Sequence, residues 1–377
     1  MIKILLMAFG KKKKIARLEF LDWARGFAAV MMIHGHVSHS FTDKRLYEGS
    51  HFILSQFIGG FPPAAFLFLT GVTLAFLMDG AEKQQLPGMT RLLKALKRAR
   101  YLWVMAFLFR IQLYLFGWGQ TSTDDLFTVD ILNCMGLALT VHSVLVFFPG
   151  AARGRVALIM GLAITFLAPL VTHNWDWLNP NLAHYFVPDA RFFSFFPWAA
   201  YVSFGMAIGT AIRLSDVDHL HSIMTWSALL ATPLIFGSQY FSNLPYTLYE
   251  DSNFWVDSPA LVLIKTGLCL LLIAAAYLWT HTYPEGTWSW VAQMGRASMV
   301  VYWVHIELVY GRWFGPWKGA LPIPAIEIIF LSMTCFMLSL AVMKTQWYDR
   351  FDFTSVLKTK SRDIQRAAGL SAPEPLK

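Results

Sequence analysis

The stretch "RLEFLDWARGFAAVMMIHGHVSHSF", residues 17–41, has charged side chains at its start, an apolar run in its middle and histidines at its end. An α-helix turns 100° and rises 1.5 Å per residue, so Arg25 and His36 differ by about 20° around the axis and roughly 16 Å along it. Ala29 and Met32 lie on the stripe between them, whereas His34 lies on the opposite side. The stretch therefore predicts one helical face with Arg25 near one end and His36 near the other.

The composition places this helix in a membrane. Hydrophobic residues make up 56% of the 377-residue chain and charged residues only 14%, whereas soluble domains carry about 25% charged residues. Runs of about 20 apolar residues can cross a bilayer. We predict an all-α polytopic membrane protein with about ten transmembrane helices, at residues 20–39, 57–79, 99–118, 128–148, 156–172, 192–212, 222–240, 259–280, 293–311 and 324–343.

The distribution of Lys and Arg predicts the orientation of these helices. With the N-terminus inside, the cytoplasmic segments collect the lysine run at 11–14, the basic stretch at 91–100 and the basic tail, as inside loops of membrane proteins do. We therefore expect both termini in the cytoplasm, with a basic N-terminal segment (1–19), a transmembrane domain (20–343) and a cytoplasmic tail (344–377). The net charge of +8 then reflects the excess of Lys and Arg in the cytoplasmic segments and attraction to lipid headgroups, not a surface for nucleic acid.

The cysteines and histidines do not predict a metal site. Cys134, Cys269 and Cys335 all fall in predicted helices, without the paired spacing of a metal site or an exported disulfide. Among the histidines of the first helix, only His36 and His39 have a spacing that lets both ligate one ion. We expect no metal.

Ionisable residues inside a membrane usually face a bundle interior or a watery cavity, because a charge in hydrocarbon costs several kcal/mol. Two simpler interpretations stay open. Arg25 with Asp22 can be an ion-paired helix end, and His36 can be hydrogen-bonded between helices. Arg110 in the third predicted helix is expected to pair with Asp130 at the start of the fourth.

The Arg25-to-His36 spacing resembles the R-x10-H signature of the transmembrane acyltransferase superfamily. This group includes the acyltransferase-3 sugar O-acetylases and the heparan-alpha-glucosaminide N-acetyltransferase-like family, to which the chain is most similar. Four further stretches resemble family motifs in the same order, over roughly residues 17–345: "GFPPAAFLFLTGVTLAF" (60–76), "DILNCMGLAL" (130–139), "FFPWAAYVSFGMAIG" (195–209) and "GRASMVVYWVHIELVY" (295–310). The chain lacks the long exported domain of the lysosomal enzyme, which favours a member of the bacterial-type inner membrane.

The resemblance implies that acetyl-CoA enters from the cytoplasm and that its acyl group passes to a sugar hydroxyl or amine on the far side. Arg25 could bind the CoA phosphates bidentately. We assign Asp22, Arg98 and Arg110 to the same co-substrate. The stretch "RLLKALKRAR" (91–100), which contains Arg98, is also explained simply as a helix that contacts lipid headgroups.

The catalytic role falls to His36, as general base or as a nucleophile that carries the acyl group. His51 and His39 are further candidates near the outer end of the first helix. His305 matches the late family histidine and could orient the acceptor or the acyl carbonyl, or simply pack between helices. Trp198 is expected to pack or to stack on a sugar.

The alternative function is a transporter or flippase for a glycan or a lipid-linked substrate, which would also need many helices and buried charges. Such proteins are often built from inverted repeats, and the sequence shows no matching halves. The expected partners are acyl-CoA, a glycan or glycolipid acceptor and membrane lipids, but no nucleic acid. Assembly into a homo-oligomer stays open.

Overall fold

A computed structural model describes residues 19–117, 122–172, 179–215, 219–246, 248–284 and 287–350. Within these ranges the chain is all-α, with one isolated β-bridge between Thr42 and Leu321 and no strand. The α-helices are α2 (Glu19–Phe41), α3 (Ser50–Gly59), α4 (Pro62–Lys83), α5 (Gly88–Phe116), α6 (Ile131–His142), α7 (Gly150–Val171), α8 (Pro180–Phe186), α9 (Phe195–Leu214), α10 (Leu220–Thr232), α11 (Ser238–Ser242), α12 (Pro259–Thr282), α13 (Trp290–Arg296), α14 (Ser298–Tyr310) and α15 (Ile323–Arg350). The predicted N-terminal segment and most of the predicted tail lie outside the described residues.

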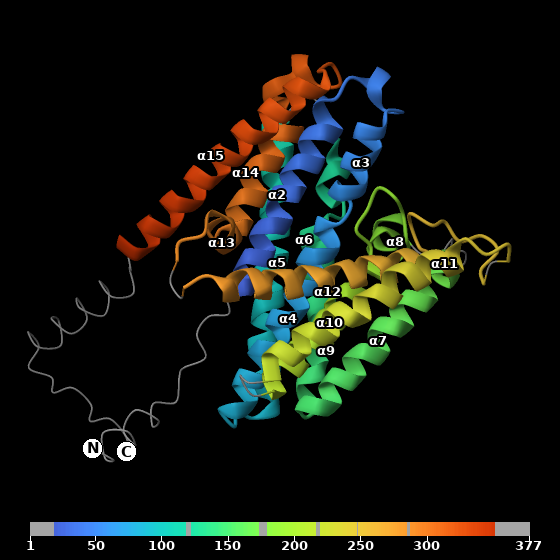
Figure 1. Ribbon diagram of the computed structural model, residues 1–377, viewed down its shortest axis with the longest axis vertical. Coiled ribbons are helices and arrows are strands. Elements are labelled where there is room, and N and C mark those ends of the chain that lie inside the picture. The colour runs from blue at the N-terminus through green and yellow to red at the C-terminus, as the bar shows by residue number, and fades with distance from the viewer. Residues whose placement is uncertain are drawn as a thin grey trace, which may run out of the picture.

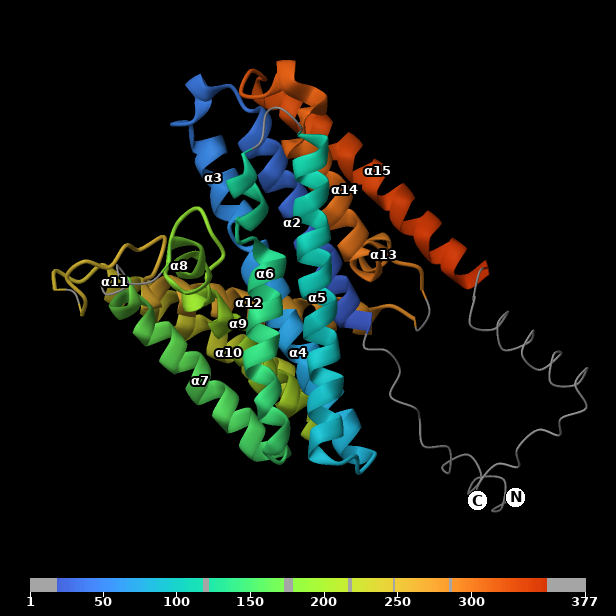
Figure 2. The ribbon, with the colours of Figure 1, turned by 180° about the vertical axis from the view of Figure 1, so that it is seen from behind.

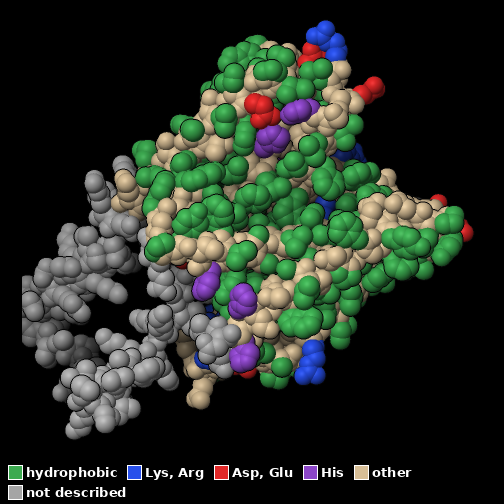
Figure 3. All heavy atoms as spheres, viewed as in Figure 1, with side chains coloured by type: hydrophobic (Ala, Val, Ile, Leu, Met, Phe, Trp, Pro, Cys, Tyr) green, Lys and Arg blue, Asp and Glu red, His purple; other side chains and the backbone are tan. Residues whose placement is uncertain are grey.

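Eight helical segments of the described chain are long and apolar enough to cross a membrane, and each overlaps one predicted span. The two remaining predicted spans contain α2, which carries charges near its start, and the shorter α14. Hydrophobic side chains cover much of the middle of the face shown in Figure 3. The all-α polytopic fold is thus confirmed, while the total of ten spans stays a prediction.

Some of the predicted spans contain a break or an irregular turn instead of one regular α-helix. The span 57–79 is divided at Gly60 and Phe61 between α3 and α4, because Pro62 and Pro63 lack the N–H that a continuing helix needs. The span 293–311 is divided at Ala297 between α13 and α14. The span 222–240 contains a π-helical turn, Pro233–Gly237, between α10 and α11. In contrast, α15 continues past the predicted end at 343 to Arg350.

The helix α2 takes part in two hydrophobic cores. Its first half, including Ala24 and Ala28, packs in a large core with α4, α6, α9 and α12. Its second half, including Ile33 and Val37, packs in a smaller core with α13, α14 and α15. Figures 1 and 2 show α15 along one side of the bundle and α7 along the opposite side. The molecule therefore divides into two packed groups of helices that share α2.

Close packing of α4 on α9 depends on two glycines. A Cβ atom on Gly205 would lie 1.9 Å from the carbonyl oxygen of Phe68, and one on Gly71 would lie 2.0 Å from that of Val202. Neither gap can hold a methyl group, so these helices touch backbone to backbone. Small residues commonly allow such contact between membrane helices.

Buried ion pairs fix the end of the bundle where α4 ends and α5 begins. Arg213 of α9 pairs with Asp79 of α4 at 2.6 Å. Arg153 of α7, which is almost fully buried, hydrogen-bonds Glu82 of α4. We call this end of the bundle the basic end, and the opposite end, which holds the C-terminal part of α2, the histidine end.

Candidate active site

A cavity of about 1020 Å³ lies between α2, α4, α5, α6 and α14. Arg25, Met32 and His36 of α2 all line it, so the face predicted to be shared does border one cavity. Ala29, predicted for the same stripe, is instead fully buried in the smaller core. The cavity walls are largely apolar between the two ends.

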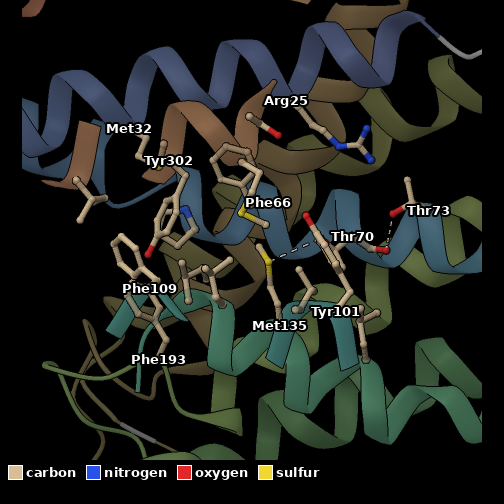
Figure 4. A pocket seen from close by; sticks show the side chains of 18 of the residues that line it. Arg25, Met32, Phe66, Thr70, Thr73, Tyr101, Phe109, Met135, Phe193 and Tyr302 are labelled. Atoms are coloured by element: carbon tan, nitrogen blue, oxygen red, sulfur yellow. Dashed lines mark hydrogen bonds between the residues drawn. The ribbon is translucent and has the colours of Figure 1, made fainter. Parts of the chain in front are cut away.

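Figure 4 shows the order of side chains along this cavity. Arg25 and Tyr101 lie toward one end, beside Thr73 of α4, while Met32 and Tyr302 lie toward the other. His36 is one helical turn beyond Met32 on α2. The cavity thus extends from the region of Arg25 to His36.

Four cations line the part of the cavity nearest the basic end: Arg25 from α2, Arg98 from α5, Arg296 from α13 and Lys344 from α15. Arg25 and Arg98 were predicted for this role, and the structure brings them to one cavity. Arg296 and Lys344 were missed. Arg296 follows a glycine at the unpredicted break between α13 and α14, and Lys344 was assigned to a tail instead of to α15.

Asp22 also lines this part of the cavity, in contact with two of the cations. It is 2% exposed, and its Oδ1 atom is 3.3 Å from Nη1 of Arg25. Its Oδ2 atom is 3.7 Å from Nε of Arg296. A carboxylate does not attract an anionic ligand, but here it orients two guanidinium groups. The geometry therefore supports a positioning role for Asp22.

A backbone contact brings Arg296 to this site. Gly26 of α2 and Gly295 of α13 face each other so closely that a Cβ on Gly295 would lie 1.8 Å from the carbonyl oxygen of Asp22. The neighbouring Arg296 is therefore held beside the first turns of α2. The glycine in "GRAS" was the sequence signal for this approach.

At the histidine end, His36 is hydrogen-bonded to His305 of α14. Nδ1 of His36 lies 3.0 Å from Nε2 of His305, and the two rings are nearly parallel, with centroids 5.2 Å apart. Nδ1 of His305 lies 2.6 Å from the carbonyl oxygen of Val301. His36 lines the cavity, whereas His305 is fully buried behind it.

These contacts assign the tautomers of the neutral pair. A carbonyl oxygen only accepts, so His305 carries its proton on Nδ1 and donates to Val301. Its Nε2 atom must then accept from Nδ1–H of His36. This leaves Nε2 of His36 with a free lone pair, which is the state that a general base or a nucleophile requires.

Arg110 is paired with Asp130 as predicted, with Nε and Oδ2 separated by 3.2 Å. Asp130 also caps α6, because its Oδ1 accepts hydrogen bonds from the backbone N–H groups of Leu132 and Asn133. Arg98 and Arg110 are twelve residues apart on α5, which is about 18 Å along a helix. Arg110 lines the same cavity but belongs to its histidine end, so the structure does not group it with Arg98.

The other candidate histidines lie away from the pair. His51 is exposed near the start of α3 and lines neither of the two cavities described here. His39 is exposed, and its Nδ1 lies 3.1 Å from Oε1 of Gln56. His34 faces Glu327 of α15 at 3.4 Å, on the side of α2 opposite to the cavity as predicted. No metal-binding group of side chains is found among the described residues.

A second cavity, of about 300 Å³, meets the first at His36. His36, Pro63, Arg191 and Phe193 line both. The sequence analysis did not predict this second cavity. It depends on the break between α3 and α4 and on the segment before α9, neither of which has a strong sequence periodicity.

The break in the α3–α4 span and the starts of α6 and α9 bring helix N-termini to this region. α4 begins at Pro62 and α9 begins at Phe195, and neither has a side-chain cap at its first turn. Helix N-termini carry partial positive charge, although Pro62 and Pro63 in α4 and Pro197 in α9 reduce the number of free N–H groups there. The histidine end of the cavity is therefore a favourable environment for negative charge.

Residues 17–243 match the family described as heparan-alpha-glucosaminide N-acetyltransferase, catalytic. The chain belongs to this family. The match contains Arg25 and His36, and it ends before α12, so Arg296 and His305 lie beyond it. No curated protein matches the chain. The predicted resemblance is thus confirmed, and the protein is an integral membrane protein with an acyltransferase-type domain.

Proposed function

We propose that the protein transfers an acetyl group from acetyl-CoA to a hydroxyl or amine of a glycan. One observation carries the proposal: a cavity joins the four cations in its part nearest the basic end to His36, where a second cavity begins. Membership of the family supports the proposal, because the matched domain is of the acyltransferase type and acetyl-CoA is the general donor of the family.

The length of this cavity suits CoA. The pantetheine arm has about twelve chain atoms between diphosphate and sulfur, the length of about four extended residues or roughly 14 Å. The eleven residues from Arg25 to His36 span roughly 16 Å of helix. A diphosphate at Arg25 would therefore place the thioester beside His36.

The phosphates of CoA match the cations at the basic end. Guanidinium groups bind phosphates bidentately, and ammonium groups add charge without fixed geometry. Arg25, Arg98, Arg296 and Lys344 together would hold the diphosphate and the ribose phosphate. Asp22 would keep Arg25 and Arg296 in place.

In the transfer step, Nε2 of His36 would take the proton from the acceptor as its oxygen or nitrogen attacks the thioester carbonyl. A carbon–oxygen or carbon–nitrogen bond forms, the carbon–sulfur bond breaks, and the proton passes from His36 to the departing thiolate. Nδ1–H of His36 stays bonded to His305 throughout and fixes the orientation of the ring. The partial positive charge at the N-termini of α4 and α9 favours the negative charge that develops at the carbonyl oxygen.

Direct transfer is the simpler path, because His36 borders both cavities. Donor and acceptor can meet at this side chain without a carrier. A covalent acetyl-histidine is the alternative chemistry. Rapid quenching of enzyme mixed with radiolabelled acetyl-CoA would distinguish them, since direct transfer leaves no labelled protein.

We place the basic end on the cytoplasmic side of a bacterial-type inner membrane, with both termini in the cytoplasm. The positive residues near the ends of α4, α5 and α7 support this orientation. CoA would then enter from the cytoplasm, and the acceptor glycan would approach from the other side. A cysteine introduced at Lys44, at the histidine end, should react with a membrane-impermeant maleimide added outside cells.

The central test is release of thiol from acetyl-CoA by full-length protein in lipid nanodiscs, with a panel of sugars as acceptors. We expect turnover that is lost in His36→Ala and a raised KM for acetyl-CoA in Arg25→Ala. His34→Ala is the matched control, because His34 lies on the same helix but faces α15. If acetyl-CoA neither binds nor reacts, the acyltransferase proposal fails and the transporter alternative takes its place.

A further inference from the structure

The second cavity contains a half-buried cation that the proposed chemistry does not use. Lys265 of α12 lines this cavity, within a helix long and apolar enough to cross the membrane. Its Nζ atom lies 5.1 Å from the ring centroid of Trp198. No carboxylate of the described residues forms an ion pair with it, and a lysine at such a depth normally marks a functional site.

Among the described residues, one carboxylate lies on the wall of this cavity, and it already has a partner. Oδ1 of Asp189 accepts from Nε of Arg191 at 3.1 Å, and Oδ2 accepts from Nη2 at 2.9 Å. These hydrogen bonds hold the pKa of Asp189 below its ordinary value, so it stays charged and paired with Arg191. The Asp189–Arg191 pair is neutral as a unit, and the charge of Lys265 remains uncompensated.

Trp198 fixes the position of this lysine. Its ring packs against Phe193 at 4.9 Å and Tyr201 at 5.9 Å between centroids. The ammonium group lies over the same ring, an arrangement stabilised by cation–π attraction. Trp198 therefore packs against two aromatic rings and the lysine, while it also lines the second cavity.

Trp255 is the most suitable aromatic residue of this cavity for stacking on a sugar. It lines the cavity and is 65% exposed. The cavity volume of about 300 Å³ is at the lower end of the range for small-molecule sites. This volume suits one sugar unit, with the remainder of a glycan outside.

We propose that the second cavity binds the acceptor and that Lys265 selects a sugar unit carrying a carboxylate or a phosphate. The acidic group would pair with the ammonium, the ring would stack on Trp255, and the reacting hydroxyl or amine would face His36. This inference rests on the proposed acetyl transfer for its direction, and it names the substrate class that the same site takes. A neutral sugar would leave the ammonium group of Lys265 without an anionic partner.

The test compares acceptors that differ only in the acidic group: methyl glucuronide against methyl glucoside, and glucosamine 6-phosphate against glucosamine. KM is measured by thiol release in nanodiscs of phosphatidylcholine, a lipid without net charge. We expect at least one acidic acceptor to have a KM about 10- to 100-fold below that of its neutral counterpart, the usual effect of a hydrogen bond to a charged group. Whichever pair shows the difference identifies carboxylate or phosphate as the group bound.

Lys265→Met should remove this preference and leave the KM for acetyl-CoA unchanged, while Lys265→Arg should keep part of it. Lys44→Met, at an exposed loop lysine of the histidine end, is the control and should change nothing. The inference is overturned if the wild type treats acidic and neutral acceptors alike, or if the preference survives in Lys265→Met.

A binding measurement separates this inference from the proposed function. Isothermal titration of the wild type and Lys265→Met with glucosamine 6-phosphate and methyl glucuronide requires no turnover. Lys265-dependent binding in a protein that never consumes acetyl-CoA would keep the anion site and reject the acyltransferase proposal. Turnover of acetyl-CoA together with acceptor binding that is independent of Lys265 would keep the acyltransferase proposal and reject the anion site.

Discussion

Replacement of His305 by phenylalanine should slow acetyl transfer without weakening acetyl-CoA binding. His305 is fully buried and does not line either cavity, but its Nε2 accepts the hydrogen bond from Nδ1 of His36 at 3.0 Å. Phenylalanine has a similar volume and no acceptor. The change therefore removes one hydrogen bond and leaves the N–H of His36 without its partner.

The magnitude follows from the cost of an unpaired polar group. A buried donor without a partner costs about 1–3 kcal/mol, and each 1.36 kcal/mol of activation free energy is a factor of ten in rate. We expect kcat to fall about 5- to 150-fold in His305→Phe. Loss of the base itself, in His36→Ala, should cost more, about 10²- to 10⁴-fold.

The assay is steady-state thiol release with acetyl-CoA varied at saturating acceptor. The KM for acetyl-CoA should stay unchanged, because the proposed phosphate contacts lie roughly 16 Å away at Arg25. His305→Gln restores a carbonyl acceptor and should recover part of the lost rate. His34→Phe is the control, since His34 contacts Glu327 and Phe330 on the far side of α2.

Two results would refute this reasoning. An unchanged kcat in His305→Phe would mean that the hydrogen bond does not orient His36. A loss as large as that of His36→Ala, with no recovery in His305→Gln, would mean that His305 itself takes part in proton transfer. Equal thermal stability of the variants in nanodiscs shows that neither result comes from unfolding.

Three further predictions test the cavity and its supports. Arg296→Ala should raise the KM for acetyl-CoA about 10- to 100-fold, whereas Arg155→Ala, exposed on α7, should leave it unchanged; similar effects of both would indicate a general charge effect. Asp130→Ala should lower stability by about 1–3 kcal/mol, because it leaves the half-buried Arg110 without its carboxylate and α6 uncapped; an unchanged melting temperature would contradict this. Gly71→Ala should destabilise the protein by forcing α4 away from α9. Gly80→Ala should be neutral or stabilising, because a Cβ at Gly80 would meet no atom within 4 Å. Equal melting temperatures of the two variants would show that the close contact is not required.

The sequence predicted the fold class well because hydrocarbon requires long apolar helices, and this requirement is visible in composition alone. The same apolar runs concealed the breaks. Gly60 and Ala297 lie inside runs that remain hydrophobic on both sides, so a count of apolar residues passes over them. The double proline at Pro62 and Pro63 was the local signal for a new helix start.

The site was predictable where one helix carries it. The angle between Arg25 and His36 depends only on helix geometry, and Arg110 with Asp130 followed from the need of a buried charge for a partner. Lys265 and Arg296 could not be placed in this way, because they reach the cavities only through packing of distant segments. The hydrophobic periodicity of a single helix does not predict contacts between segments that are far apart in the sequence.

The position of Arg25 and His36 on one rigid helix has a consequence for donor choice. Their separation is fixed by backbone hydrogen bonds along α2, which both hydrophobic cores hold in place. A thioester on a shorter arm, such as acetyl-pantetheine without phosphates, can reach His36 but cannot at the same time bind the cations at the basic end. Binding energy from those remote phosphates is then not available to hold the carbonyl at the reacting position. Such a truncated donor should therefore lose kcat as well as affinity, as expected where remote contacts support the chemical step.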